Sequence, residues 1–418
     1  MTAALGSLLV EPVPRLVGHV AVPGDKSISH RSVLIGAMCD GETHVTGFGR
    51  SADTEATIAA VRALGVDVYE HGVDTLRVFG KGLRGLRAPG RPIDCANAGT
   101  LVRLIAGILA GQDGESFELT GDESLSRRPM GRISEPLGRM GARLETTDGH
   151  LPMTVSGDAL HAIDYALPVA SAQVKSAILL AGLFADGETT VVEPAPTRDH
   201  TERMLQAAGA DVAVRSTSVT VRPAERLSLG EVEVPGDFSS AAPFIVAATL
   251  VQGSELHVHG VNLNPRRTGL LEILERMGAN VTVYNRRSIG GEPGGDLEIH
   301  SAPLVGTAVA QRTCRSRSTS CRSSRSRRRA RAARACCAAR RSSARRRRTG
   351  SRRPSTRCGR SARAPVRTRT ASRSRAYPHG SAAGGSTAAA TTASPCSARS
   401  PVSPRGKACA SRARTSWG

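Results

Sequence analysis

The chain has 418 residues, enough for two or three domains, and its net charge of +21 comes from two unlike parts. Residues 311–418 hold 29 Arg, one Lys and no acidic residue. The 27 Lys and Arg that remain of 57, set against all 36 Asp and Glu, give residues 1–310 a net charge of −9. No apolar run approaches the ~18 residues that a membrane span needs, so we expect no membrane protein.

Cysteine usage follows the same division. Of the nine cysteines, residues 1–310 contain Cys39 and Cys95, and the other seven lie in the basic tail. Two isolated cysteines do not form a disulfide framework, so we expect a cytoplasmic protein. Residues 1–10 have no basic segment before their short apolar run, so we expect no signal peptide.

The first predicted elements are a strand over residues 16–22 and a helix over residues 28–38, separated by Pro23 and Gly24. Asp25 or Ser27 is the predicted helix cap.

This helix N-terminus brings together groups that suit an anion. Free backbone N–H groups, a hydroxyl, Lys26 and Arg31 would all lie near one point, which favours phosphate. The structural alternative is an ordinary capped helix with two solvated cations.

A repeat of about 70 residues runs through residues 1–310. Four predicted helices end in a similar short motif, with glycine after the last turn. Each is followed by a predicted strand in which apolar and polar residues alternate. These glycines are Gly65, Gly141, Gly209 and Gly278. The segment 22–27 also recurs at 234–239, with Phe238 in the place of Lys26. We therefore expect two pseudo-equivalent domains built from one helix-and-strand unit.

Three further motifs open predicted helices with polar or cationic groups. Residues 97–103 precede an apolar helix over 101–109, for which Asn97 or Thr100 is the predicted cap. Residues 121–130 contain the adjacent Arg127 and Arg128, and a guanidinium suits carboxylate or phosphate. Residues 168–176 open a helix over 177–184. A capped helix or a surface turn is the alternative explanation for each motif.

Residues 197–202 complete the series. Asp199 and Glu202 have the spacing of a capping box, so we expect both to be structural, and we expect the same of His200. His257 and His259 share one strand face, but the sequence shows no Cys or carboxylate cluster beside them. We predict no metal and no cofactor.

The segment Gly24 to Arg31 resembles the N-terminal signature of the 5-enolpyruvylshikimate-3-phosphate (EPSP) synthase family, also called 3-phosphoshikimate 1-carboxyvinyltransferases. The later motifs follow in the family's order, and the resemblance covers about residues 15–310. It implies a two-lobed α/β (α+β) fold of repeated βαβ-type units. The implied second lobe is residues 23–235, and the implied first lobe, here incomplete, is 1–22 plus 236–310.

The resemblance also implies a reaction in the shikimate pathway of aromatic amino-acid biosynthesis. The enolpyruvyl group of phosphoenolpyruvate passes to the 5-hydroxyl of shikimate 3-phosphate, and phosphate is released. The implied shikimate 3-phosphate ligands are Lys26, Ser27, Arg31, Ser171, Ala172, Gln173, Thr197 and Arg198. The implied phosphoenolpyruvate ligands are Lys26, Asn97, Gly99, Thr100, Arg103, Arg128 and Gln173. Lys26 is the implied catalytic group, and the implied oligomeric state is a monomer.

Two other functions remain open. A UDP-N-acetylglucosamine enolpyruvyl transferase would share the fold, although the motif at 26–31 and residues 171–173 favour shikimate 3-phosphate. The second alternative is a nucleic-acid-binding protein that acts through the Arg/Ser-rich tail. We expect no specific nucleic-acid partner.

The tail contains no Leu, Ile or Phe, so we expect disorder over residues 311–418. The resemblance implies Ile-Asp-Glu, Lys-Glu-Thr-Asp-Arg and Asp-His-Arg motifs there, and all three are absent. Reading GC-rich codons for these motifs one base out of phase produces strings found at Ser318–Ser326, Arg346–Ser351 and Thr391–Cys396. We therefore interpret the tail as a frameshift product and predict that the chain as written is inactive.

Overall fold

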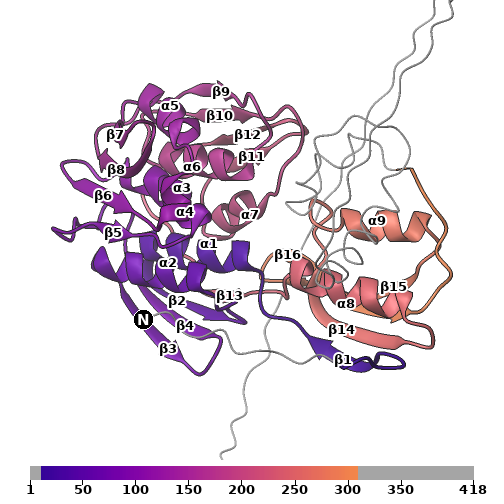
Figure 1. Cartoon of the computed structure of the whole chain (residues 1–418). Helices are drawn as coiled ribbons and strands as arrows, with labels where there is room; N and C mark the ends of the chain where they lie inside the picture. The colour runs from indigo at the N-terminus through magenta and orange to yellow at the C-terminus, as the bar shows by residue number, and fades with distance from the viewer. Residues whose placement is uncertain (1–10, 309–418) are drawn as a thin grey trace, which may run out of the picture. The chain divides into compact units, whose positions relative to one another are not determined.

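The computed structural model describes residues 11–308 (Figure 1). The predictions for the tail, its disorder and its out-of-frame origin, fall outside the described residues. Within residues 11–308 the fold is mixed α/β with four sheets of four strands each, which confirms the predicted fold class. No helix of this part of the chain is both long enough and apolar enough to cross a membrane.

Each sheet belongs to one copy of a β-α-β-α-β-β unit, to which the second unit adds one short helix, so the predicted repeat is confirmed. Within a unit the first and second strands pair in parallel and the other pairs are antiparallel, so a helix connects each parallel pair. The second unit consists of β5 (Ile93–Asp94), α3 (Gly99–Leu109), β6 (Ser116–Thr120), α4 (Glu123–Ser126), α5 (Gly131–Arg139), β7 (Arg143–Thr147) and β8 (His150–Ser156). The third consists of β9 (Asp164–Ala166), α6 (Ala172–Gly182), β10 (Thr189–Val192), α7 (His200–Ala207), β11 (Val212–Val214) and β12 (Ser218–Val221).

The first and fourth units each take one strand from a distant part of the chain. The first consists of α1 (Lys26–Met38), β2 (Asp40–Thr46), α2 (Ala52–Ala63), β3 (Asp67–His71), β4 (Thr75–Lys81) and the late strand β13 (Glu231–Glu233), which pairs with β2. The fourth consists of α8 (Phe238–Leu250), β14 (Glu255–Asn262), α9 (Gly269–Arg276), β15 (Asn280–Ile289), β16 (Glu292–His300) and the early strand β1 (Val17–Ala21), which pairs with β14. The chain therefore begins in the fourth unit, builds the other three and returns.

The four repeat glycines have the same backbone conformation. Their φ angles are 89° at Gly65, 100° at Gly141, 88° at Gly209 and 84° at Gly278. This left-handed conformation is unfavourable for residues with a Cβ, and it turns the chain from a helix into the next strand. The glycine pattern therefore marked the same structural position in each unit.

Two separate hydrophobic cores lie within the described residues. One contains buried side chains from Ile28 to Val234, and the other contains side chains from Phe238 to Ile299 with Leu16, Val20 and Val22 packed against it. The boundaries of the two predicted lobes, after residue 22 and after residue 235, stay a prediction.

The two chain crossings between these cores have matching geometry. Gly24 and Gly236 form an antiparallel bridge. Asp25 caps α1 and Asp237 caps α8, each through its side chain. Arg267 contacts both carboxylates, at 2.9 Å from Asp25 and 2.6 Å from Asp237. The recurrence of segment 22–27 at 234–239 thus corresponds to two equivalent helix caps, Asp25 and Asp237, which both pair with Arg267.

Candidate active site

Two arginines converge over the start of α3. A Cβ added to Gly99 would lie 2.7 Å from Nη1 of Arg128 and 2.9 Å from Nη1 of Arg103. Glycine therefore leaves room for both guanidinium groups beside the helix N-terminus. Burial, with the nearby Arg128 and Arg132, lowers the pKa of Arg103. The arrangement concentrates positive charge and N–H donors, which suits a carboxylate or phosphate.

The first turn of α6 adjoins this arginine pair. Nη1 of Arg103 donates to Oε1 of Gln173 at 3.2 Å, and Nε2 of Gln173 donates to Oγ1 of Thr100 at 3.1 Å. Ser171 caps α6 by accepting a hydrogen bond from the backbone N–H of Val174, so this helix begins at Ala172 rather than at the predicted residue 177. The structure therefore brings together motifs about 70 residues apart, with Ala172 following the cap of the same helix.

The predicted caps of α3 are wrong. The N-cap residue is Ala98, and no side chain caps the helix. Asn97 instead donates to Asp122 at 2.8 Å and accepts a hydrogen bond from Arg128. The side-chain oxygen of Asn97 therefore holds Arg128 in place and does not cap the backbone N–H groups of α3.

The N-terminus of α1 carries a second group of predicted ligands. Asp25, one of the two predicted caps, accepts hydrogen bonds from the backbone N–H groups of Ser27 and Ile28. Nζ of Lys26 forms an ion pair with Asp53 at 2.8 Å, and Lys26 is half exposed. Nη1 of Arg198 donates to Oγ of Ser27 at 3.2 Å. Residues from the start and the end of the second predicted lobe thus meet at α1.

Arg31 is buried, and its donors are directed at neighbouring protein groups. It donates to Oγ1 of Thr201 at 2.6 Å, to Oγ of Ser176 at 2.9 Å and to the carbonyl of Ser27 at 2.8 Å. Burial lowers the pKa of Arg31 to about 10, which still leaves it charged at neutral pH. In this structure Arg31 ties α1 to α6 and α7.

The Thr197 segment is held by a buried ionic cluster that the sequence analysis missed. Thr197 donates its hydroxyl hydrogen to Glu193, and its carbonyl accepts from Arg266 at 2.6 Å. Glu193 and Glu202 both pair with Lys175, at 3.0 and 2.6 Å, and all three side chains are almost fully buried. A lysine on the mostly apolar α6 was the one sequence signal for this cluster.

We expect Lys175→Met to destabilise the chain by roughly 3–5 kcal/mol, because it leaves the buried Glu202 without its ion-pair partner and leaves Glu193 with Arg266 alone, at 3.9 Å. The control is Lys81→Met, which removes an exposed pair with Asp67 and should cost about 1 kcal/mol or less. Urea unfolding followed by circular dichroism measures both values. Equal free energies of unfolding for the two variants would contradict the structural role of Lys175.

The predicted capping box at Asp199 and Glu202 is also wrong. Asp199 makes no side-chain cap hydrogen bond; its carboxylate accepts from Asn264 at 2.6 Å and lies 3.4 Å from Arg266. His200 is buried and pairs with Glu292 at 2.7 Å. These contacts connect α7 with the chain that follows β14, which local sequence spacing could not indicate.

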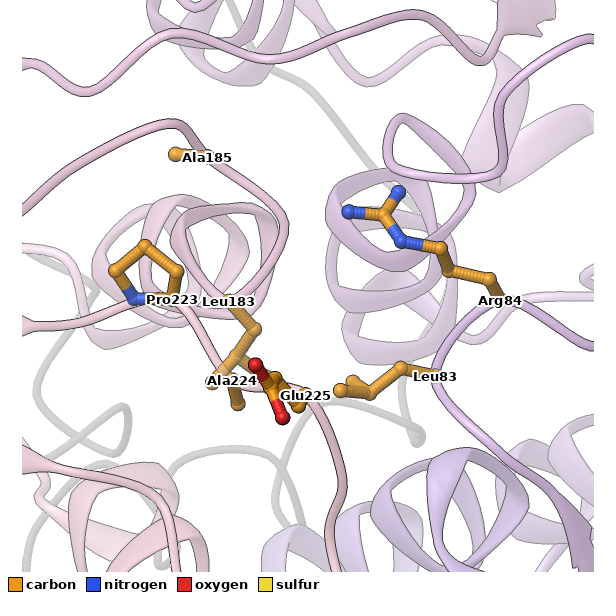
Figure 2. Close-up of a pocket in the computed structure, with 7 residues that line it drawn as sticks. All are labelled: Leu83, Arg84, Leu183, Ala185, Pro223, Ala224 and Glu225. Carbon is orange, nitrogen blue, oxygen red and sulfur yellow. The ribbon is translucent and has the colours of Figure 1, made fainter.

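Two hollows lie in the second predicted lobe. Figure 2 shows the first, of about 570 Å³, where Leu83 and Arg84 face Leu183 and Pro223; it contains none of the predicted ligands. The second, of about 270 Å³, is lined by Gly131, Arg132, Glu135, Tyr165, Leu167, Pro168, Val169, Ser171 and Val174. The second hollow therefore borders the predicted site and adds Arg132 to its cations, whereas the first is separate from it.

Comparisons with known proteins find similarity to one family. The sequence profile of the family described as EPSP synthase (3-phosphoshikimate 1-carboxyvinyltransferase) matches residues 10–322. A 3-phosphoshikimate 1-carboxyvinyltransferase of Acidithiobacillus ferrooxidans is 54% identical over 304 residues, 73% of this chain and 70% of the relative. That of Alkalilimnicola ehrlichii is 52% identical over 304 residues, 72% of this chain and 68% of the relative. The solved structure of the EPSP synthase from Acinetobacter baumannii matches with a TM-score of 0.68 and 46% identity, over 72% of this chain and 69% of that one.

Proposed function

The chain belongs to the EPSP synthase (3-phosphoshikimate 1-carboxyvinyltransferase) family, and from that premise we propose how its described residues serve the reaction. The reaction transfers the enolpyruvyl group of phosphoenolpyruvate to the 5-hydroxyl of shikimate 3-phosphate and releases phosphate. Both substrates carry a phosphate and a carboxylate. The site must therefore supply several cations and N–H donors in a fixed arrangement.

We assign phosphoenolpyruvate to the N-terminus of α3. The observation that carries the assignment is the convergence of Arg103 and Arg128 over Gly99, with Gln173 bonded to both Arg103 and Thr100. Guanidinium groups bind carboxylate and phosphate by paired hydrogen bonds, and the helix N-terminus adds backbone donors.

We assign shikimate 3-phosphate to the first turns of α1 and α6. Ser171 and Ala172 open α6, and Gln173 links this turn to the phosphoenolpyruvate group. Ser27 and Arg198 are hydrogen-bonded at the start of α1, where Lys26 also lies. Lys26 would then be shared by the two anionic substrates, and Thr197 and Arg31 would complete the acceptor site.

The transfer also requires an acid, a base and cations where charge develops. The family resemblance places an aspartate, a Lys-Glu pair and a further arginine after residue 311, where this sequence has no acidic side chain. We therefore propose that the described residues bind the substrates and that the chain as written does not turn them over.

The alternative function, enolpyruvyl transfer to a UDP-amino sugar, is tested by measuring which acceptor substrate the chain binds. In isothermal titration calorimetry, the full chain should bind shikimate 3-phosphate, whereas unphosphorylated shikimate and UDP-N-acetylglucosamine should give no saturable heat. Arg198→Gln should weaken shikimate 3-phosphate binding about tenfold or more, since a hydrogen bond to a charged group contributes roughly 1.5–3 kcal/mol. Arg222→Gln, which alters an exposed arginine paired with Asp211 and Glu188, is the matched control. Binding of the UDP-sugar in place of shikimate 3-phosphate would favour the sister enzyme.

We also propose a monomeric, cytoplasmic protein without a specific nucleic-acid partner. Cys39 and Cys95 are free and buried, and burial raises the pKa of each thiol to about 12, which supports a stable reduced state. DNA binding by residues 1–310 without the basic tail, weakening as salt is raised, would support the nucleic-acid alternative instead.

A further inference from the structure

The sheet of the fourth unit has one face rich in histidine and carboxylate side chains. Strand pairing places His19 of β1 opposite His257 of β14, and His257 opposite Glu298 of β16. Side chains alternate along a strand, so Glu255 and His259 share the face of His257. The intervening Leu256 and Val258, with Leu297 and Ile299 of β16, belong to the hydrophobic core on the other face. The polar face therefore points away from the core.

The ligand atoms of three of these residues lie close together. One atom each from Glu255, His257 and Glu298 lie within 4.8 Å of one another. The expectation that no carboxylate lies beside His257 is thus wrong, because Glu298 is far away in sequence and reaches His257 through strand pairing. Two carboxylates and one imidazole are donors that Zn²⁺ accepts.

The charges of this cluster differ from those of the other acidic clusters. Within residues 11–308, the salt-bridge contacts of Glu255 and Glu298 are with His257, at 3.9 Å, and with His300, at 2.8 Å, and neither carboxylate pairs with a Lys or Arg. The cluster of Asp199, His200 and Glu292 also has metal-like spacing, but Arg203 and Arg266 already neutralise its carboxylates. The sheet cluster is therefore the one that gains most from a divalent cation.

A neighbouring side chain orients the imidazole. Nδ1 of His257 lies 3.1 Å from the hydroxyl of Tyr284 on β15. A hydrogen on Nδ1 would be donated to Tyr284, which leaves the lone pair of Nε2 on the side of Glu255. Such an outer hydrogen bond fixes the tautomer of a metal-binding histidine and strengthens its binding.

We propose that Glu255, His257 and Glu298 form a binding site for one divalent metal ion such as Zn²⁺ on the outer face of this sheet. The three protein ligands leave a fourth position for water. The site is separate from the proposed substrate ligands, all of which lie between Lys26 and Arg198. Binding the ion would tie β14 to β16, the central strands of the sheet.

The test is titration of the full chain with Zn²⁺ alone, followed by calorimetry. Because the tail contains seven cysteines, the protein is first treated with N-ethylmaleimide so that exposed thiols cannot bind the metal. We expect one Zn²⁺ per chain, with affinity reduced roughly tenfold or more in His257→Ala and in Glu298→Gln. Tyr284→Phe, which removes the outer hydrogen bond alone, should weaken binding about tenfold.

His161→Ala is the matched control, because His161 is an exposed histidine 2.9 Å from a carboxylate, Asp186, in another sheet unit. It should bind Zn²⁺ like the parent chain. Circular dichroism of each variant checks that substitutions at the partly buried His257, Tyr284 and Glu298 leave the fold intact. The proposal is overturned if the parent shows no saturable binding, or if His257→Ala, Glu298→Gln and the parent bind equally.

Discussion

Restoring the reading frame with a one-base change near codon 311 is expected to convert an inactive chain into an active enzyme. The tail as written contains no Asp or Glu and cannot supply the aspartate and the Lys-Glu pair that the family requires. Its arginines cannot act as the base because they do not deprotonate in proteins. General acid–base groups contribute about 10²–10⁴-fold each, so we expect the restored chain to be at least roughly a thousandfold faster.

The measurement is phosphate release from phosphoenolpyruvate and shikimate 3-phosphate by the two purified chains. The control is calorimetric binding of shikimate 3-phosphate, which both chains should show because the proposed ligands precede residue 311. Comparable turnover by the two chains would refute both the frameshift interpretation and the roles assigned to the missing residues. Sequencing the gene over codons 305–320 checks the frame independently.

In the frame-restored chain, Lys26→Ala is expected to remove nearly all turnover. Lys26 lies at the start of α1 beside Ser27 and Arg198, where one cation can serve both anionic substrates. Loss of a group that stabilises developing charge costs about 10²–10³-fold in kcat. The fold should survive because the Lys26–Asp53 pair is partly exposed, and such pairs contribute about 1 kcal/mol or less.

Lys81→Ala is the matched control for this experiment. Lys81 also forms a surface ion pair with an aspartate, Asp67, but it lies at the end of β4 and is no proposed ligand. Its substitution should leave phosphate release unchanged. If Lys26→Ala retained activity within a few-fold of the parent, Lys26 would be a structural partner of Asp53 and the catalytic assignment would be wrong.

The sequence by itself determined the features that depend on neighbouring residues. The four repeat glycines and the Asp25 cap were predictable because each follows from local backbone geometry. The repeat of about 70 residues and the recurrence of segment 22–27 at 234–239 then predicted the repeated units. Family membership could be inferred because each motif is a short continuous segment of the sequence.

Tertiary structure decided which polar side chains meet. Asn97 and Asp199 carry good capping groups, yet their side chains bind Arg128 and Asn264 because those partners are brought close by other elements. A local cap and a distant partner compete for the same oxygen atoms, and the sequence shows only the first.

The same reasoning explains the clusters that the sequence did not reveal. Lys175 on α6 pairs with Glu193, which follows β10, and with Glu202 on α7. His257 lies opposite Glu298 because β14 pairs with β16. Arg267 joins two caps that lie 212 residues apart, Asp25 and Asp237. Burial and pairing of charge depend on how the units pack, because the energy of an ion pair is set by distance in space and by exclusion of water.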